Sequence, residues 1–388
     1  MTRYAAAAAL AAVLAWGALH VHNDPTRDGR AASFSILSGA ALGVIFQRSR
    51  FCFTSACRDL FLIKDRRGAL GVLAALAVGS VGYMVVFGAR LPDPGRYLPD
   101  IGHLAPANWH LLLGGACFGL GMVLAGGCVS GSLYRLGEGS LVAPVTLLAA
   151  VPGYWLGYLF WEFVYLNAIA TGPVVWLPKH LGYAGALGLQ LAVIGGLAAL
   201  LLWKYPALPP RPGDTPSIRS VLRRTFVTGW SAPLGGLLIG ILATFTLLRT
   251  APLGVTSELG RLSLRSGQKL GFLPAKITGL GQFRSCSQIE ETGALLGDGA
   301  LFVITLVAGS AVAALLSGEF RWRVGKPRTY LLAVPGGLLI GLGSALSLGC
   351  TVGTLLSGIM AFSLSGWVFA AGLLGGAWAG GRILRRMA

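Results

Sequence analysis

Long apolar runs recur along the whole chain and limit what it can fold into. Only 12% of the residues are charged, about half the fraction usual in a soluble protein. The runs are continuous rather than alternating, which excludes a β-barrel. We therefore expect an all-α polytopic membrane protein, because each run is close to the length that crosses a bilayer. The runs cover residues 4–21, 33–47, 68–89, 110–127, 140–162, 184–203, 229–248, 299–317, 330–348 and 362–383.

One pattern occurs twice in the chain. GGACFGLGMVLAGGCVSGSLYRL begins at Gly114, and GGLLIGLGSALSLGCTVGTLLSG begins at Gly336. At a constant offset of 222 positions, six glycines and one cysteine coincide, and the cysteines are Cys128 and Cys350. Each copy predicts an apolar helix that runs into Gly-Cys, breaks, and restarts as a short half-helix.

The repeated pattern divides the chain into four parts. We expect an N-terminal span and loop (1–32), a first repeat (33–183), a linker span with a Pro-rich basic loop (184–228), and a second repeat (229–388). Each repeat has four spans, and the odd span between them inverts the second. Inverted repeats with broken or re-entrant half-helices hold a ligand near the bilayer midplane, where we expect the two breaks to face each other. The Gly-rich stretch 249–298 is expected to fold back into the protein.

The net charge of +17 is explained by basic residues that hold loops on the cytoplasmic side. Attraction of an anionic substrate is a second explanation. Nucleic-acid binding is excluded because no compact Arg/Lys block with interleaved aromatics is present. The sequence has no P-loop and no Cys/His cluster, so we expect no ATP hydrolysis, no metal and no cofactor. The basic segments are 1–4, 48–67, 204–228, 318–329 and 382–388.

The Gly-Cys breaks are candidate anion sites. A half-helix that starts after Gly127-Cys128 or Gly349-Cys350 presents free backbone N–H groups and its positive dipole end to the break. A thiol adds a weak donor and a polarizable sulfur. The alternative is that the glycines only let helices pack closely. Two Gly-Cys pairs in register favour function, because non-helical backbone at membrane depth needs a cavity or burial in protein.

Cys52 lies between a short span and a charged loop, in RSRFCFTSACRDL. Arg50 and Arg58 are candidates to draw anions toward it, although charges that retain a cytoplasmic loop explain them equally. The second Arg-x-Cys, Arg284 to Cys286, makes Cys286 a candidate mate of Cys52. We expect the pairs Arg58–Asp59 and Arg135–Glu138 to be structural. Packing is the default role for Cys57 and Cys117.

Several motifs in order resemble the YeeE/YedE family of bacterial inner-membrane sulfur transporters. They are FCFTSACRD, GMVLAGGC with SGSLYRLGEG, and GLGSALSLGCTVGTLLSGIMAFSLSGW, and the match covers about residues 33–388. The resemblance implies uptake of thiosulfate, with Cys52, Cys128 and Cys350 as the cysteines along the pathway. Cys57 departs from the family's SAFRD, and Cys286 has no clear counterpart. A small cytoplasmic TusA-like sulfur carrier is the implied partner.

We therefore expect a multi-pass inner-membrane transporter, not an enzyme, that imports thiosulfate past Cys350 and Cys128 and releases it past Cys52. One alternative is a membrane sulfurtransferase that passes sulfane sulfur through a cysteine persulfide to a carrier. Another is a transporter of selenium compounds or soft metals.

Overall fold

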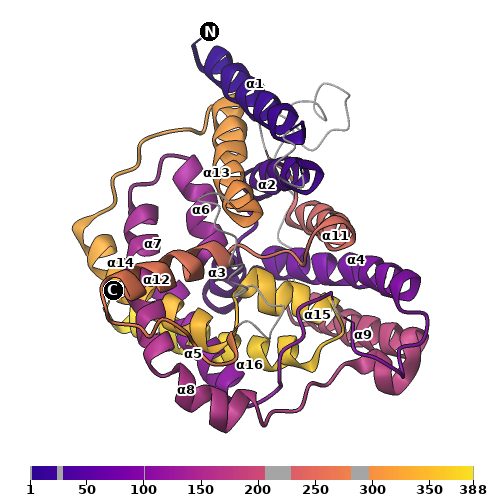
Figure 1. The fold of residues 1–388 in the computed structure, drawn as a ribbon. Coiled ribbons are helices and arrows are strands. Elements are labelled where there is room, and N and C mark those ends of the chain that lie inside the picture. The colour runs from indigo at the N-terminus through magenta and orange to yellow at the C-terminus, as the bar shows by residue number, and fades with distance from the viewer. Residues whose placement is uncertain (1, 24–28, 100, 206–228, 281–296, 388) are drawn as a thin grey trace.

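The computed structural model describes residues 2–23, 29–99, 101–205, 229–280 and 297–387. Within these ranges the chain is helical, and its only β-pairing consists of two isolated bridges. Ten helical segments of this described part are long and apolar enough to cross a membrane (Figure 1). Each of them overlaps one of the ten apolar runs, so the expectation of an all-α polytopic membrane protein is confirmed.

The first half of the chain is a series of membrane-length helices with short segments between them. Its first break separates α5 from α6, and a second irregularity lies in α9, where Gly182 has a non-helical φ of 68°. The elements are α1 (Thr2–His22), α2 (Gly29–Ser49), α3 (Phe53–Arg58), η1 (Asp59–Ile63), α4 (Arg67–Arg90), α5 (Trp109–Leu124), α6 (Val129–Gly137), α7 (Val142–Leu159), α8 (Trp161–Val164), η2 (Tyr165–Ile169) and α9 (Leu177–Lys204).

The second half has a similar order of elements. After the second break the chain restarts as a short helical segment, as expected, and the first part of that segment is a π-helix, η5. The elements are α11 (Ala232–Arg249), α12 (Ser257–Lys269), α13 (Asp298–Ser317), α14 (Pro327–Leu346), η5 (Thr351–Ser357), α15 (Gly358–Met360) and α16 (Leu364–Met387).

Helices of the two halves pack on one another rather than forming separate bundles. The most extensive contacts join α2 to α13, α4 to α11, α5 to α16 and α7 to α14, and α5 also packs on α14 (Figure 1). Lipid offers little hydrophobic drive for helix association, so such pairs depend on close van der Waals packing at small residues.

Glycines set the close approach of α5 and α14. A Cβ atom on Gly114 would lie 3.0 Å from the Gly343 carbonyl oxygen, and one on Gly121 would lie 2.6 Å from the Gly336 carbonyl oxygen. As the chain advances from Gly114 to Gly121 along α5, its neighbours on α14 move backward from Gly343 to Gly336. The two helices therefore run antiparallel.

The basic connections gather on one face of the protein. Arg50 forms an ion pair with Glu319, with 2.9 Å between Nη2 and Oε1. Arg66 donates to the carbonyl oxygen of Leu202, and Arg385 donates to that of Phe61. These contacts bring the segments 48–67, 202–205, 319–323 and 382–387 to the same face.

Residues 257–280 pack back onto the helices, as expected for the first part of 249–298. The Trp155 indole donates to the Ser263 carbonyl oxygen at 2.8 Å, and the Trp161 indole donates to the Thr278 carbonyl oxygen at 2.9 Å. Leu264 is buried in a cluster with residues of α7 and α8. Residues 281–296 lie outside the described ranges.

Candidate functional site

The first break lies between α5 and α6 and is built around Cys128. Gly126 adopts a left-handed φ of 74°, which turns the chain out of α5. Cys128 is extended and caps α6, with its sulfur 3.4 Å from the Gly131 amide nitrogen and 3.3 Å from the Ser130 hydroxyl oxygen. The thiol is fully buried. The predicted break after Gly-Cys is therefore present in the first repeat.

Cys52 lies against Cys128. It follows α2 in an extended conformation, caps α3 and is 4% exposed. The Cys52 and Cys128 thiols interact electrostatically and are not joined in a disulfide. A Cβ atom on Gly131 would lie 2.9 Å from the Cys52 sulfur and 3.4 Å from the Cys128 sulfur. Gly131 therefore makes room for two neighbouring thiols at the start of α6.

The second break lies between α14 and η5 and is built around Cys350. Leu348, the position aligned with Gly126, has a left-handed φ of 59°, which costs a non-glycine residue about 1–2 kcal/mol. Cys350 is 1% exposed and caps η5 without a hydrogen bond from its side chain. Both breaks thus use the same turn, although only the first has glycine at the turning position.

His103 supports the second break from the segment that precedes α5. Its Nε2 lies 3.0 Å from the Thr354 hydroxyl oxygen, and that hydroxyl lies 3.3 Å from the Ser347 carbonyl oxygen. His103 also interacts with the backbone of Leu348. Burial lowers the pKa of His103 to about 4, so the ring is neutral at physiological pH.

A small pocket lies beside the second break. The hydroxyls of Ser344 and Thr256 face the Tyr154 phenol. Neither hydroxyl oxygen makes a hydrogen bond of normal geometry to a described residue. A cavity of about 10 Å³ with such hydroxyls suits a single water molecule, because desolvated donors gain from a partner. The lining residues are Tyr154, Tyr158, Trp161, Thr256, Gly260, Leu280, Ser344, Ala345 and Gly349.

The two breaks lie at opposite ends of the α5–α14 crossing. A Cβ atom on Gly336, in the middle of α14, would lie 2.6 Å from the amide nitrogen of Ala125 in the first break. One on Gly114, near the start of α5, would lie 3.0 Å from the Ser347 backbone nitrogen in the second break. From Gly336 to Ser347 the helix rises about 16 Å. The breaks therefore do not face each other, because the antiparallel helices end at opposite sides.

The candidate arginines have anionic partners. Arg50 pairs with Glu319, and Arg58 pairs with Asp59 as expected, with 2.9 Å between nitrogen and oxygen in each pair. The expected ion pair between Arg135 and Glu138 is wrong: the nearest cation to Glu138 at ion-pair distance is Arg323, at 3.9 Å. Arg and Glu three residues apart can pair on a continuous helix, but here Glu138 is already the C-cap of α6.

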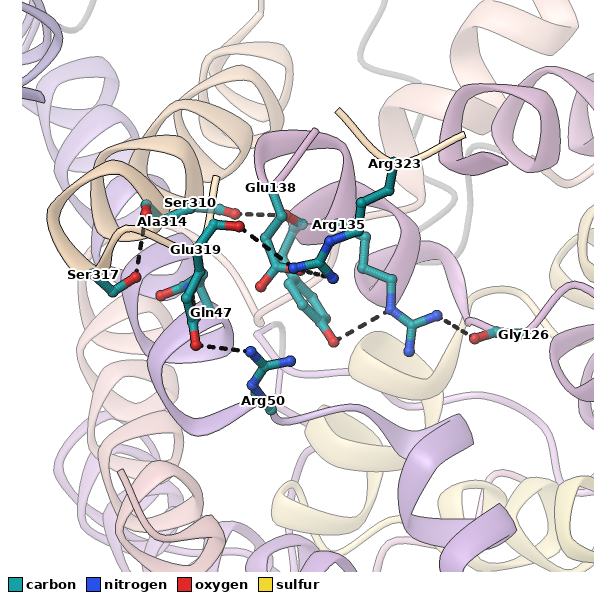
Figure 2. A network of polar contacts seen from close by, with 11 residues as sticks. Gln47, Arg50, Gly126, Arg135, Glu138, Ser310, Ala314, Ser317, Glu319 and Arg323 are labelled. Carbon is teal, nitrogen blue, oxygen red and sulfur yellow. Dashed lines mark hydrogen bonds and ion pairs between the residues drawn. The ribbon is translucent and has the colours of Figure 1, made fainter. Parts of the chain in front are cut away.

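Arg135 turns toward the first break instead. Its guanidinium donates to the carbonyl oxygen of Gly126 and, at 3.4 Å, to the hydroxyl oxygen of Tyr134 (Figure 2). It also acts electrostatically on the Cys52 thiol. A Cβ atom on Gly127 would lie 3.4 Å from the same guanidinium. A cation therefore lies beside the paired thiols, although the sequence reasoning gave it only a structural role.

The remaining cysteines that the structure describes are not part of either break, although Cys57 interacts electrostatically with Cys52. Cys57 is a buried residue of α3, and Cys117 is half-buried in α5. Arg284 and Cys286 fall outside the described residues. Sequence reasoning also missed His103 and Tyr154. The one usable signal was an ionisable side chain in a membrane-length segment, which marks Arg135 but not the other two.

Comparison with known proteins gives these features a context. The family model described as "Sulphur transport" matches residues 48–379. A "Thiosulfate transporter TsuA" of Spirochaeta thermophila is 31% identical over 363 residues, covering 90% of this chain and 98% of that protein. The Escherichia coli protein of the same name is 27% identical, over 88% and 92% of the two chains.

A more distant relative matches only part of the chain. The "Probable transporter YedE" of Escherichia coli is 30% identical over 193 residues, covering 49% of this chain and 43% of that protein. Together with the match over residues 48–379 and the ten membrane-length helices, these similarities show that the chain belongs to the sulphur transport (YeeE/YedE) family of multi-pass membrane proteins.

Proposed function

We propose that this protein imports thiosulfate, or a closely related sulfur oxyanion, across the bacterial inner membrane, and that it is not an enzyme. The family and the names of two relatives that match nearly the whole chain support a sulfur anion as substrate. The observation that carries the proposal is the pair of helix breaks, each with a buried thiol at the start of a new helical segment.

We place one station for the anion at each helix break. Cys350 and Gly349, beside the Tyr154 pocket, form one station. Cys128, Gly127 and Cys52 form the other, so that Cys52 belongs to the same station as Cys128 and not to a third one. At each station, thiols and backbone N–H groups replace part of the hydration shell that the anion loses. Weak contacts in series allow the ion to enter and to leave again.

An inverted repeat places the stations at opposite sides of the membrane centre. Gly114 and Gly336 are equivalent by sequence, as are Gly121 and Gly343. The contacts are reciprocal, since Gly114 approaches Gly343 and Gly121 approaches Gly336. A two-fold axis in the membrane plane relates contacts in this way, which supports residues 33–183 and 229–388 as the inverted units.

The basic face supports an orientation for the protein in the membrane. Arginines of segments 48–67, 319–323 and 382–387 meet there, and the positive-inside rule assigns that face to the cytoplasm. The Cys52–Cys128 station lies near this face, because Cys52 is two residues from Arg50. The same face is where we place docking of a TusA-like sulfur carrier, since such a carrier must collect sulfur in the cytoplasm.

Uptake by the purified protein in proteoliposomes tests the proposal. We expect uptake of radiolabelled thiosulfate that unlabelled thiosulfate suppresses strongly and sulfate suppresses weakly. Selenite and sulfite are included as competitors, and each measurement is repeated with and without a proton or sodium gradient. Equal competition by sulfate, or no uptake under any gradient, would contradict a thiosulfate importer.

The contact between Cys52 and Cys128 supports a second candidate, sulfur transfer. A thiolate attacks the sulfane sulfur of thiosulfate, the S–S bond of thiosulfate breaks, and sulfite leaves with the electron pair, so that a cysteine persulfide remains. The neighbouring thiol is placed to receive that sulfur. Mass spectrometry after incubation with thiosulfate separates the two candidates: a stable increment of one sulfur atom, about 32 Da, favours transfer, and an unmodified chain favours conduction.

A further inference from the structure

Six charged side chains gather where α2, α6 and α13 end on the basic face. Glu319 accepts hydrogen bonds from Gln47 at 2.7 Å and from Arg50 at 2.9 Å (Figure 2). Four guanidinium groups act on two carboxylates, so the cluster carries a net charge of +2. Its members are Arg48, Arg50, Arg135, Glu138, Glu319 and Arg323.

Glu138 is the buried anion of this cluster. Its side chain is 4% exposed, and one carboxylate oxygen lies 3.9 Å from Arg323. The other oxygen, Oε1, is buried and has no hydrogen bond to any residue that the structure describes. A buried carboxylate with an unpartnered oxygen is costly, because desolvation is not offset by a full set of hydrogen bonds. Burial also raises the pKa of Glu138, while Arg50 and Arg323 oppose that rise.

The backbone holds Glu138 where it is. The Arg321 amide donates to the Glu138 carbonyl oxygen at 3.2 Å, and the Arg323 amide donates to the Gly139 carbonyl oxygen at 2.9 Å. The corner after α6 and the connection after α13 are therefore joined by main-chain hydrogen bonds that do not depend on the Glu138 carboxylate. Neutralising the carboxylate leaves this junction in place.

Arg135 connects the cluster to the paired thiols. It interacts electrostatically with both Cys52 and Glu138. Exposure then increases outward, because Arg50 and Arg323 have side chains that are 57% and 48% exposed. An anion that leaves the Cys52–Cys128 station toward water thus passes Arg135 and then the remaining guanidinium groups.

We propose that this cluster is an inner binding subsite for a divalent oxyanion, in which Glu138 is the resident anion that the passing ion must displace. The inference rests on the proposed transport function and extends it to the release step. With Glu138 ionised, the guanidinium groups attract the dianion without trapping it. Glu138 then returns to the vacated guanidinium groups and expels the ion toward the cytoplasm.

The variant Glu138→Gln tests this role, with Glu162→Gln as a control that removes an exposed carboxylate from α8. A unit charge about 7 Å from a dianion contributes about tenfold in affinity at the dielectric constant of water. We expect Glu138→Gln to bind radiolabelled thiosulfate and sulfate about tenfold more tightly, to lower both KM and maximal uptake, and to lose this gain at high salt. Glu162→Gln should match the wild type.

Two results would overturn the proposal. A role limited to holding the fold predicts that Glu138→Gln lowers stability and uptake without tightening either anion. If Glu138→Gln fails to fold, the variant Arg323→Gln tests the subsite through the opposite change in affinity. Both anions should bind this variant about tenfold more weakly, and unchanged binding refutes the subsite. Sulfate binding separates the subsite proposal from the proposal of thiosulfate import. Tighter sulfate binding by Glu138→Gln would support the subsite even if the wild-type protein takes up no thiosulfate.

Discussion

Replacing Gly121 with alanine tests the close crossing of α5 and α14 on which the arrangement of the two breaks depends. The added Cβ atom would lie 2.6 Å from the Gly336 carbonyl oxygen and 2.8 Å from the Ile340 amide nitrogen. Non-bonded heavy atoms settle at about 3.5 Å, so the two backbones must separate by up to about 1 Å. Neither neighbour is a flexible side chain, and overpacking of this kind costs about 1–3 kcal/mol.

The control is Gly196→Ala in α9, where an added Cβ atom meets nothing within 4 Å. Alanine there should raise the stability by about 0.5–1 kcal/mol, because it lowers the entropy lost when the helix forms. Thermal unfolding of both variants in one detergent measures the difference. Because both breaks are attached to these helices, Gly121→Ala should also reduce thiosulfate uptake. Equal unfolding midpoints for the two variants would refute the close crossing.

Three further predictions concern the breaks themselves. Gly131→Ala should cost about 1 kcal/mol and reduce uptake, because its Cβ atom would lie 2.9 Å from the Cys52 sulfur; unchanged uptake would contradict the paired thiols. Uptake losses of Cys52→Ala and Cys128→Ala should be less than additive in the double variant, since both residues serve one station, and full additivity would argue for separate ones. The pKa of His103 is about 4 in the folded state, against about 6.5 in the unfolded state. The unfolded state therefore binds the proton more readily, and His103 lowers the free energy of unfolding by up to about 3 kcal/mol as the pH falls from 6.5 to 4. The variant His103→Gln should flatten the dependence of stability on pH in this range.

The sequence was sufficient to predict the elements that depend on local composition. All ten apolar runs correspond to membrane-length helices, because a run of that length and polarity has few other stable states. The first Gly-Cys break follows from the same logic, since Gly126 permits the left-handed turn. The second does not, because Leu348 adopts that turn against its own preference and only the surrounding packing holds it there.

Contacts between distant segments were harder to predict. Register matches between the repeats identify equivalent positions, but they do not say which positions touch. The antiparallel crossing puts Gly114 on Gly343 and separates the two breaks, where the sequence reasoning had them facing each other. Similarly, Arg135 and Glu138 have the spacing of a helical ion pair. In the structure, Arg135 instead donates to the carbonyl oxygen of Gly126, and the Glu138 carboxylate lies nearest to Arg323.

Thiosulfate uptake by the Cys128→Ala and Cys350→Ala variants, reconstituted in proteoliposomes at equal protein density, tests the central claim most directly. Each variant removes the buried thiol from one break, and Cys117→Ala provides a control at a half-buried cysteine within α5, outside both breaks. With both stations in one pathway, each of the two variants should lose most of the uptake, while Cys117→Ala retains it. Uptake at the wild-type rate by both Cys128→Ala and Cys350→Ala would contradict a pathway through the two helix breaks.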